Sequence, residues 1–312
     1  MNADLPGPPS WPRLGVGTWA WGDRPIWGYG RTYGRAEVGE AFRASLDAGI
    51  TFFDTAEVYG WGTSERILGE LRQEAGRPIL IATKFAPFRL TSRSLLRALD
   101  GSLARLQVKA VDLYQIHFPP FFVRLEPLLE ALAEAALSGK ARAVGVSNFS
   151  ADQMRRAYDV LGRREVRLAG NQVEYSLLHR PPEGDGVLRA CRELGVPLIA
   201  YSPLARGLLT GKYGPDGRRH PLRLGRYLRA WRPEALSQVI GLLKEIGRAH
   251  SKTPSQAALN WLLRWPEVVV IPGAKNRSQA RENAGALGWE MGPEEAEALD
   301  RATRPRRAPE SG

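Results

Sequence analysis

The sequence has the length and composition of an ordinary folded protein, with an excess of positive charge. It has 312 residues, of which 43% are hydrophobic and 25% charged, and its formal net charge is +11. This composition is sufficient for a sizeable core, and the length suits a single α/β barrel. The charge permits binding to nucleic acid or to anionic membranes. However, the basic residues are scattered outside two dense stretches at 218–232 and 301–307, and no nucleic-acid recognition motif accompanies them. We therefore expect neither partner.

Cysteine content and the N-terminus narrow the class of protein further. The single cysteine, Cys191, excludes an intramolecular disulfide framework and a multi-cysteine metal site. It lies in a helical pattern beside apolar residues, which favours a small core residue over a nucleophile. Residues 1–10 are rich in proline and glycine and lack the apolar segment of a signal peptide. No apolar run reaches the roughly 18 residues of a membrane span. We expect a cytoplasmic protein without a metal.

Short apolar runs alternate with helical patterns along the whole chain. The expected strands are Arg13–Thr18, Ile50–Asp54, Pro78–Lys84, Val111–His117, Ala141–Asn148, Leu168–Gln172, Val196–Tyr201 and Glu267–Ile271. The expected helices are Ala36–Ala48, one from Ser64 through Leu71, Thr91–Leu106, Leu125–Leu137, one after Ser150, Gly186–Leu194, Ala235–Ala249, Ser255–Leu263, Arg277–Leu287 and Pro293–Thr303. Ser64 and Ser150 are expected to cap their helices through their hydroxyls. Residues 205–233 show no firm period and are expected to form a long loop that acts as a lid.

This alternation predicts a (β/α)8 barrel, the TIM-barrel fold. Nearly every expected strand is a continuous apolar run, which indicates a parallel sheet covered on both faces. Eight such units in about 300 residues fit a closed barrel better than an open doubly wound sheet. The first strand–helix turn also lacks the G-x-G-x-x-G fingerprint of a Rossmann domain. We expect residues 1–312 to form one domain, with a core of about 14–303, a flexible leader at 1–12 and a flexible tail at 304–312.

Four polar side chains lie at the ends of three consecutive expected strands. Asp54 and Tyr59 follow the second strand. Lys84 ends the third strand and His117 ends the fourth. Taken singly, such residues are usually solvated, packed in a loop or satisfied in the core. Because the C-terminal ends of parallel barrel strands open on one rim, we expect the four to lie together as a catalytic set.

The chemistry of this set is that of a proton donor. A free tyrosine, with a pKa of about 10, is a weak acid near neutrality. An ammonium beside it lowers the phenol pKa, and a carboxylate can hold the ammonium in place. We therefore expect Tyr59 to protonate a carbonyl oxygen, with Lys84 tuning it, Asp54 anchoring Lys84, and His117 orienting the substrate. A proton donor without a nucleophile or a metal needs a source of hydride, which implies a nicotinamide cofactor.

These residues lie within motifs that resemble the aldo-keto reductase family. The resemblance runs from about Leu14 to about Thr303. It is carried by Gly49-Ile-Thr-Phe-Phe-Asp-Thr-Ala-Glu-Val-Tyr-Gly60, Ile81-Ala-Thr-Lys84, Tyr114-Gln-Ile-His117, Gly145-Val-Ser-Asn-Phe149, Asn171-Gln-Val-Glu-Tyr175, Tyr201-Ser-Pro-Leu204 and Ile271-Pro-Gly273. The catalytic tetrad that it implies is Asp54, Tyr59, Lys84 and His117.

The resemblance also implies which residues hold the nicotinamide and the pyrophosphate. Ser147, Asn148 and Gln172 match residues that bind the carboxamide, and Tyr201 matches the aromatic residue on which the nicotinamide stacks. The segment after this tyrosine would pass along the pyrophosphate, through Ser202, Pro203, Leu204, Gly207 and Leu209. From the residues alone, Ser147 and Asn148 could instead start a loop or cap a helix, and Tyr201 could simply pack.

The resemblance also implies that Ile271 to Asn283 bind the adenosine end of the cofactor. Many relatives carry a lysine after Ile-Pro that pairs with the 2′-phosphate of NADP, whereas this chain has Gly273. Lys275 and Arg277 could serve instead, because clustered cations favour a dianionic phosphate. Gln279 and Asn283 match adenosine contacts. We expect NADP rather than NAD, although both charges could equally form a solvated helix start.

The remaining inferences concern the substrate and the activity. Aromatic residues that could line an apolar substrate pocket, or else belong to the core, are Trp19, Trp21, Trp27, Phe85, Phe118, Phe121 and Phe122. We expect an NADP-dependent oxidoreductase that reduces small aldehydes or ketones to alcohols. One alternative is a nicotinamide-binding regulatory subunit, like the channel-associated members of the same family. The other is a phosphate-ligand lyase that uses Lys84 as a Schiff-base amine.

Overall fold

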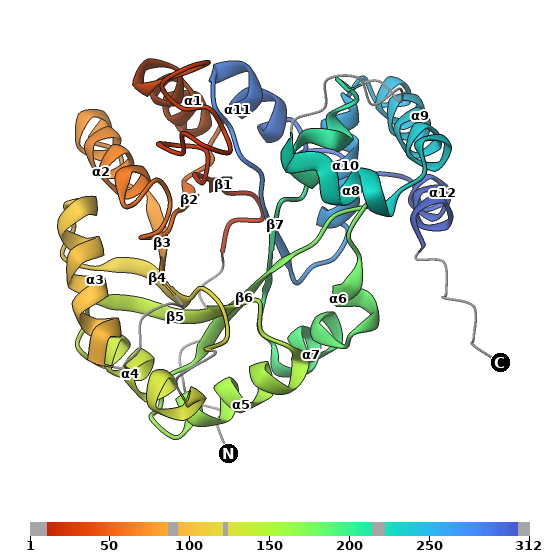
Figure 1. Ribbon diagram of the computed structural model, residues 1–312. Coiled ribbons are helices and arrows are strands. Elements are labelled where there is room, and N and C mark those ends of the chain that lie inside the picture. Colours follow the sequence, from red (N-terminus) through yellow and green to blue (C-terminus); the bar gives the residue numbers. More distant parts are fainter. Residues whose placement is uncertain (1–10, 87–92, 121–123, 214–221, 305–312) are drawn as a thin grey trace.

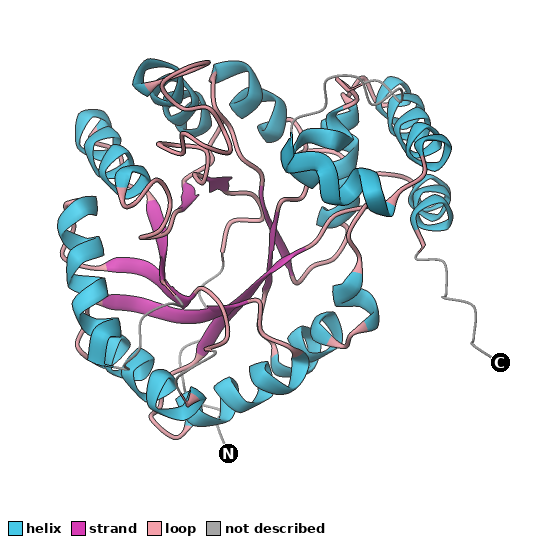
Figure 2. Cartoon of the chain, viewed as in Figure 1, coloured by secondary structure: helices cyan, strands magenta, loops and turns pink. Residues whose placement is uncertain are grey.

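Eight parallel strands surrounded by helices form the centre of the molecule (Figures 1 and 2). The computed structural model describes residues 11–86, 93–120, 124–213 and 222–304. The strands are β1 (Val16–Gly17), β2 (Phe52–Asp54), β3 (Leu80–Phe85), β4 (Val111–Ile116), β5 (Ala141–Ser147), β6 (Leu168–Glu174), β7 (Leu198–Tyr201) and β8 (Val268–Ile271). Consecutive strands pair in parallel from β1 to β8. The amides of Gly15 and Gly17 donate to Val270 O and Pro272 O at 2.9 and 3.0 Å, so the sheet closes and the predicted (β/α)8 barrel is confirmed.

The helices alternate with the strands and cover the outside of the barrel (Figure 1). They are α1 (Arg35–Asp47), α2 (Thr63–Ala75), α3 (Arg93–Leu106), α4 (Leu125–Leu137), α5 (Ala151–Gly162), α6 (Pro181–Gly184), α7 (Val187–Leu194), α8 (Gly225–Ala230), α9 (Pro233–Ala249), α10 (Pro254–Leu263), α11 (Arg277–Ala284) and α12 (Pro293–Thr303). Two short 3₁₀ helices, η1 (Ala205–Thr210) and η2 (Leu222–Leu224), lie after β7. Every long helix was predicted, and α6 was missed because four residues carry no periodic signal.

One predicted cap is confirmed and the other is wrong. Ser150 accepts the amide of Gln153 and completes a capping box at the start of α5. Helix α2 instead begins after Gly62, which adopts φ 82°. Ser64 is fully buried, and its hydroxyl donates to Thr18 O at 3.0 Å. The hydroxyl of Ser64 therefore connects α2 to the β1 loop.

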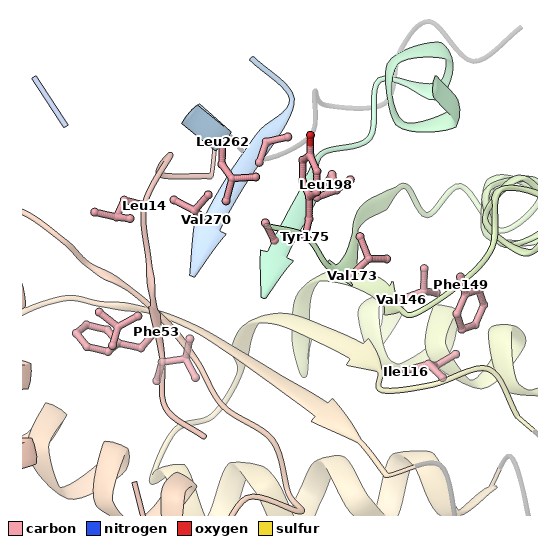
Figure 3. Close-up of a cluster of buried hydrophobic side chains, with 14 of the residues drawn as sticks. Leu14, Phe53, Ile116, Val146, Phe149, Val173, Tyr175, Leu198, Leu262 and Val270 are labelled. Atoms are coloured by element: carbon pink, nitrogen blue, oxygen red, sulfur yellow. The ribbon is translucent and has the colours of Figure 1, made fainter. Parts of the chain in front are cut away.

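Two layers of apolar side chains hold the barrel together. The larger lies between strands and helices, and Figure 3 shows part of it, including Phe53, Val146 and Val270. The smaller fills the barrel interior and includes Trp11, whose ring stacks on Phe52 with centroids 5.3 Å apart. Trp11 Nε1 also donates to Ala169 O at 2.9 Å. Trp11 is only 8% exposed and packs into the barrel interior. The prediction that Trp11 belongs to a flexible leader is therefore wrong.

The segment after β7, expected to be a long loop, is partly helical where the structure describes it. Helix α8 lies against the rim of the barrel, where Tyr227 Oη donates to the Glu174 carboxylate at the end of β6 and Arg226 pairs with the same group. Trp231 Nε1 donates to Leu178 O at 3.1 Å. These contacts fasten the segment beside the barrel mouth. Residues 214–221, which include part of the predicted arginine-rich lid, lie outside the described residues.

Candidate active site

A cavity of about 390 Å³ opens at the C-terminal ends of the strands. Its volume is within the range of small-molecule sites. It extends from the β1 and β2 ends, past β6 and β7, to the loop that follows β8. Its lining includes Trp19, Trp27, Asp54, Tyr59, Gln172, Tyr201, Ser202, Pro203, Leu204, Arg206, Gly207, Thr210, Lys212, Arg223, Ile271, Gly273, Lys275, Gln279, Glu282 and Asn283. The cavity therefore lies on the rim where the strand-end residues were expected.

Asp54, Lys84 and Tyr59 are in direct contact at one end of this cavity. Lys84 Nζ donates to Asp54 Oδ1 at 2.5 Å and to Tyr59 Oη at 3.3 Å. It also donates to the carbonyl of Thr55 at 2.8 Å. The register places Asp54 beside Ala82 in β3, two residues before Lys84, so both side chains point into the barrel. Lys84 is fully buried and Asp54 is nearly so, while Tyr59 lines the cavity.

Two glutamines hold the other side of the Asp54 carboxylate. Gln172 Nε2 donates to Asp54 Oδ2 at 2.8 Å, and Gln115 Nε2 lies 3.4 Å from the same oxygen. Sequence reasoning assigned Gln172 to the cofactor and overlooked Gln115. The signal was available, because Gln115 lies on the fourth expected strand two residues before His117, and alternate strand residues point the same way.

The electrostatics differ from the expectation for Tyr59. We expected Lys84 to lower the phenol pKa, but in this structure the pKa of Tyr59 lies well above 10 because of burial and the charge of Asp54. The Asp54 carboxylate at 2.5 Å offsets the positive charge of Lys84. Burial lowers the pKa of Lys84, and Asp54 opposes that shift. Tyr59 is therefore a neutral phenol, the form that can donate a proton.

His117 lies beside Tyr59 on the outer side of this group. The two rings make an edge contact with centroids 5.7 Å apart. Burial and the charge of Lys84 lower the pKa of His117 to about 3, so its imidazole is neutral near pH 7. Its Nδ1 is buried without a hydrogen-bond partner in the described part of the chain. His117 contacts Tyr59 as a neutral ring, but it is not among the residues that line the cavity as the structure describes it.

The expected nicotinamide residues form a chain of hydrogen bonds behind the cavity wall. Tyr201 lines the cavity, and its Oη donates to Asn148 Oδ1 at 3.0 Å. Asn148 Nδ2 donates to His117 O at 3.0 Å. Ser147 Oγ donates to Gln172 O at 2.8 Å. Neither Ser147 nor Asn148 belongs to the lining of the cavity as the structure describes it.

The segment after β7 supplies one side of the cavity. Ser202, Pro203, Leu204 and Gly207 line it as expected, whereas Leu209 is fully buried in the core and does not. Leu209 belongs to the side of η1 that packs into the core together with Ala205 and Leu208. Sequence reasoning missed three residues in and around this segment that also line the cavity: Arg206, Thr210 and Lys212.

The opposite end of the cavity is cationic. Lys275 lines it with Arg223 and Lys212, and burial together with these two charges lowers the pKa of Lys275 to about 8. Ile271, Gly273, Gln279 and Asn283 line the same end. Arg277 does not: its side chain is 54% exposed and lies 4.0 Å from Glu40. On helix α11 its position places it toward α1 rather than toward the cavity.

The aromatic residues expected in the substrate pocket divide into two groups. Trp19 and Trp27 line the cavity, with ring centroids 5.6 Å apart. Trp21 and Phe85 do not, because both are buried in the core; Trp21 packs on Phe42 and Phe53. Phe118 is 38% exposed and stacks on His117, with centroids 5.0 Å apart, outside the lining. Phe121 and Phe122 lie outside the described residues.

The chain is similar to known proteins over nearly its whole length. The model of the aldo/keto reductase family matches residues 13–304, which is nearly the whole chain. The chain belongs to the aldo/keto reductase family. A curated relative, the chloroplastic pyridoxal reductase of Arabidopsis thaliana, is 38% identical over 96% of this chain and 85% of its own length.

Solved structures agree with this assignment. A glycerol dehydrogenase from Gluconobacter oxydans matches with a TM-score of 0.85 at 28% identity, covering 99% of this chain and 97% of its own. An aldo/keto reductase from Klebsiella pneumoniae, solved in complex with NADP and acetate, matches with a TM-score of 0.75 at 29% identity, covering 95% and 93%. Family members act on small-molecule carbonyl compounds.

Within the described residues, no helix is both long and apolar enough to span a membrane, and no three His, Cys, Asp or Glu side chains gather as metal ligands do.

Proposed function

We propose that this protein is an NADP-dependent oxidoreductase that reduces small aldehydes or ketones to alcohols, with Tyr59 as the proton donor. The observation that supports the proposal most directly is the contact of Lys84 Nζ with both Asp54 and Tyr59. A bound NADPH would supply the hydride to the carbonyl carbon. The residues of the chain have to bind the substrate, orient it and deliver the proton.

Each of the four strand-end residues has a distinct part in that task. Tyr59 is neutral and lines the cavity, so its hydroxyl can protonate the oxygen of a bound carbonyl compound. Lys84 then stabilises the phenolate that remains, because its ammonium already lies 3.3 Å from that oxygen. Asp54 keeps Lys84 in place and charged. His117, a neutral ring in edge contact with Tyr59, would help to orient the substrate oxygen beside that hydroxyl.

The cavity has the features that a large anionic cofactor needs. Three cations, Lys212, Arg223 and Lys275, line one end, and such a cluster favours a phosphate group. Arg223 Nε and Trp27 Nε1 are buried donors without partners among the described residues, as expected of groups that bind a ligand. We therefore propose NADP rather than NAD. Lys275 would bind the 2′-phosphate in place of the lysine that many relatives carry at the position of Gly273.

The environment of Lys84 argues against the lyase alternative. A Schiff-base lysine must present a free amine to the substrate, whereas Lys84 is fully buried and donates to Asp54, Thr55 and Tyr59. No contact in the described residues favours the regulatory-subunit alternative over turnover. The regulatory-subunit alternative predicts NADPH binding with little turnover of aldehydes, and the following assay measures both.

The test compares Tyr59→Phe with the parent protein in NADPH oxidation assays with a panel of aldehydes. We expect turnover to fall by roughly 10²- to 10⁴-fold, because general acid catalysis contributes that much. NADPH binding, followed by fluorescence, should change little. Tyr158→Phe is the matched control, because Tyr158 lies on α5, outside the cavity lining. Equal rates for Tyr59→Phe and the parent would rule out the proton-donor role, and absence of NADPH binding would rule out the function.

A further inference from the structure

The barrel interior changes from apolar to polar toward the C-terminal ends of the strands. Ala82 of β3 and Leu113 of β4 belong to the apolar cluster of the interior. Two residues further along the same strands are Lys84 and Gln115, which are register partners. Alternate residues of a strand point to the same face, so both side chains point into the barrel. Gln115 is fully buried there, at a position that packing alone would fill with a branched apolar side chain.

The side-chain amide of Gln115 meets two partners across the barrel. Its Nε2 lies 3.4 Å from Asp54 Oδ2, and its Oε1 lies 3.4 Å from Gln172 Nε2. Gln172 Nε2 also donates to Asp54 Oδ2 at 2.8 Å. The two amides converge on one carboxylate oxygen, while Lys84 donates to the other. Gln115 therefore supplies one donor directly and helps to hold the Gln172 donor in place.

The space for the Gln115 side chain depends on a glycine in the next strand. Gly145 of β5 is the register partner of Gln115. A Cβ at Gly145 would lie 3.3 Å from Gln115 Cγ and 3.0 Å from Gly170 O. Contacts this close would force neighbouring atoms to move in a close-packed interior. The barrel thus accommodates this glutamine because Gly145 has no side chain.

The two amides act on the charge state of the buried ion pair. Burial favours the neutral forms of a carboxylate and an ammonium, because removing a charge from water costs free energy. Hydrogen bonds to the charged forms oppose the transfer of a proton from Lys84 to Asp54. The amide donors on Asp54 Oδ2 favour the carboxylate, and Thr55 O, at 2.8 Å from Lys84 Nζ, favours the ammonium. The amides therefore help to keep a positive charge beside Tyr59.

The other ionisable groups around the pair do not take over this part. Glu65 of α2 favours the Lys84 ammonium through its charge. The pKa of His117 is lowered to about 3 by burial and the Lys84 charge, and burial raises that of Tyr201 to about 12, so both rings are neutral near pH 7. In the described part of the chain, the donors to Asp54 Oδ2 are the two glutamines.

We propose that Gln115 is a positioning residue for proton delivery, acting through Asp54 to keep Lys84 charged. This inference rests on the proposed function and adds a residue to its site. Gln115 does not belong to the cavity lining, so we expect it to touch neither substrate nor cofactor. When Tyr59 gives its proton to the carbonyl oxygen, its O–H bond breaks and the electron pair stays on the phenolate oxygen, while NADPH supplies the hydride. The charged ammonium stabilises that phenolate.

The test replaces Gln115 with methionine, which has a similar volume and no N–H donor. kcat for aldehyde reduction should fall by roughly tenfold, near the lower end for a hydrogen bond to a charged group, because the contact is long at 3.4 Å. Alcohol oxidation with NADP requires the Tyr59 phenolate, so its rise with pH should move upward by about one pH unit. NADPH affinity, measured by fluorescence, should stay within about threefold. Gln115→Asn, which withdraws the amide by one methylene, should change the rates in the same direction.

Asn260→Leu is the matched control, because Asn260 is another buried amide and lies outside the cavity lining. Its Nδ2 donates to Ala286 O and Trp289 O at 3.1 and 2.9 Å. This variant should lose stability in urea denaturation and keep the rates and pH profiles of the parent. The proposal is overturned if Gln115→Met also loses only stability. It is equally overturned if Gln115→Met weakens only NADPH binding, because Gln115 would then act through Gln172 on the cofactor.

A stability measurement keeps this proposal distinct from the proposed function. Gln115→Met should destabilise the parent protein and leave the stability of the Asp54→Asn protein nearly unchanged, because no carboxylate then needs the donor. If no aldehyde is reduced but this coupling is found, the proposed activity fails and the support of Asp54 by Gln115 stands. If aldehydes are reduced and the coupling is absent, the role of Gln115 fails and the activity stands.

Discussion

The buried pair of Asp54 and Lys84 allows its structural and chemical parts to be separated by a double-mutant cycle. Lys84→Met leaves the Asp54 carboxylate in the barrel interior, supported only by Gln172 at 2.8 Å and Gln115 at 3.4 Å. Asp54→Asn leaves the Lys84 ammonium with Thr55 O and the Tyr59 hydroxyl. Removing one partner of a buried ion pair typically costs about 3–5 kcal/mol. Because neutral partners remain in both variants, we expect about 3 kcal/mol for each.

The double variant should be much less destabilised than the sum of the two single variants. With Asn and Met in place, no charge is buried without a partner, and we expect a total loss of about 3 kcal/mol, which gives an interaction energy of about 3 kcal/mol. Urea denaturation of the four proteins measures these free energies of unfolding. Activity should not recover in the double variant, because Tyr59 still lacks its ammonium. If the two single losses simply add, the pair is not the coupled unit that the 2.5 Å contact indicates.

Two predictions concern the dependence on pH. The pKa of Lys275 in the free protein is lowered to about 8, and a bound phosphate should raise it, so NADPH binding should take up a proton and weaken as pH rises above about 8. Binding titrations across pH should show this trend in the parent protein and a weaker dependence on pH in Lys275→Ala. The same dependence on pH in both proteins would contradict the assignment of Lys275 to the phosphate. Since the pKa of His117 is lowered to about 3, kcat/KM should show no imidazole limb between about pH 5 and 8. A limb in that range that disappears in His117→Asn would show that the ring titrates there.

Much of the fold could be predicted from local sequence alone. The long helices carry a strong signal because their buried residues recur about every 3.6 residues. The strands carry one because every residue of a strand in a fully covered sheet is buried, which gives a continuous apolar run. The eight-fold alternation then implies parallel strands with their C-terminal ends on one rim. Asp54, Lys84 and His117 could therefore be placed together from the sequence, because each lies at the end of a strong expected strand and the topology determines which rim they share.

Other features depended on packing between segments far apart in the sequence. Trp19, Trp21 and Trp27 belong to one loop, where no periodicity indicates direction. The structure turns Trp21 onto Phe42 and Phe53 in the core, and the other two toward the cavity. Trp11 looked like part of a leader because its partners, Phe52 and Ala169, are distant along the chain.

The electrostatics of the site were also decided by tertiary structure. Local sequence patterns were enough to predict the barrel, the rim and the types of group that gather there. The direction of the Tyr59 pKa depended on how close Asp54 lies to Lys84 and on burial, which only the packed barrel determines. The place of Arg206 depended on a left-handed turn inside a short helix. Local patterns specify which elements form, whereas distances between charges arise only when the elements pack.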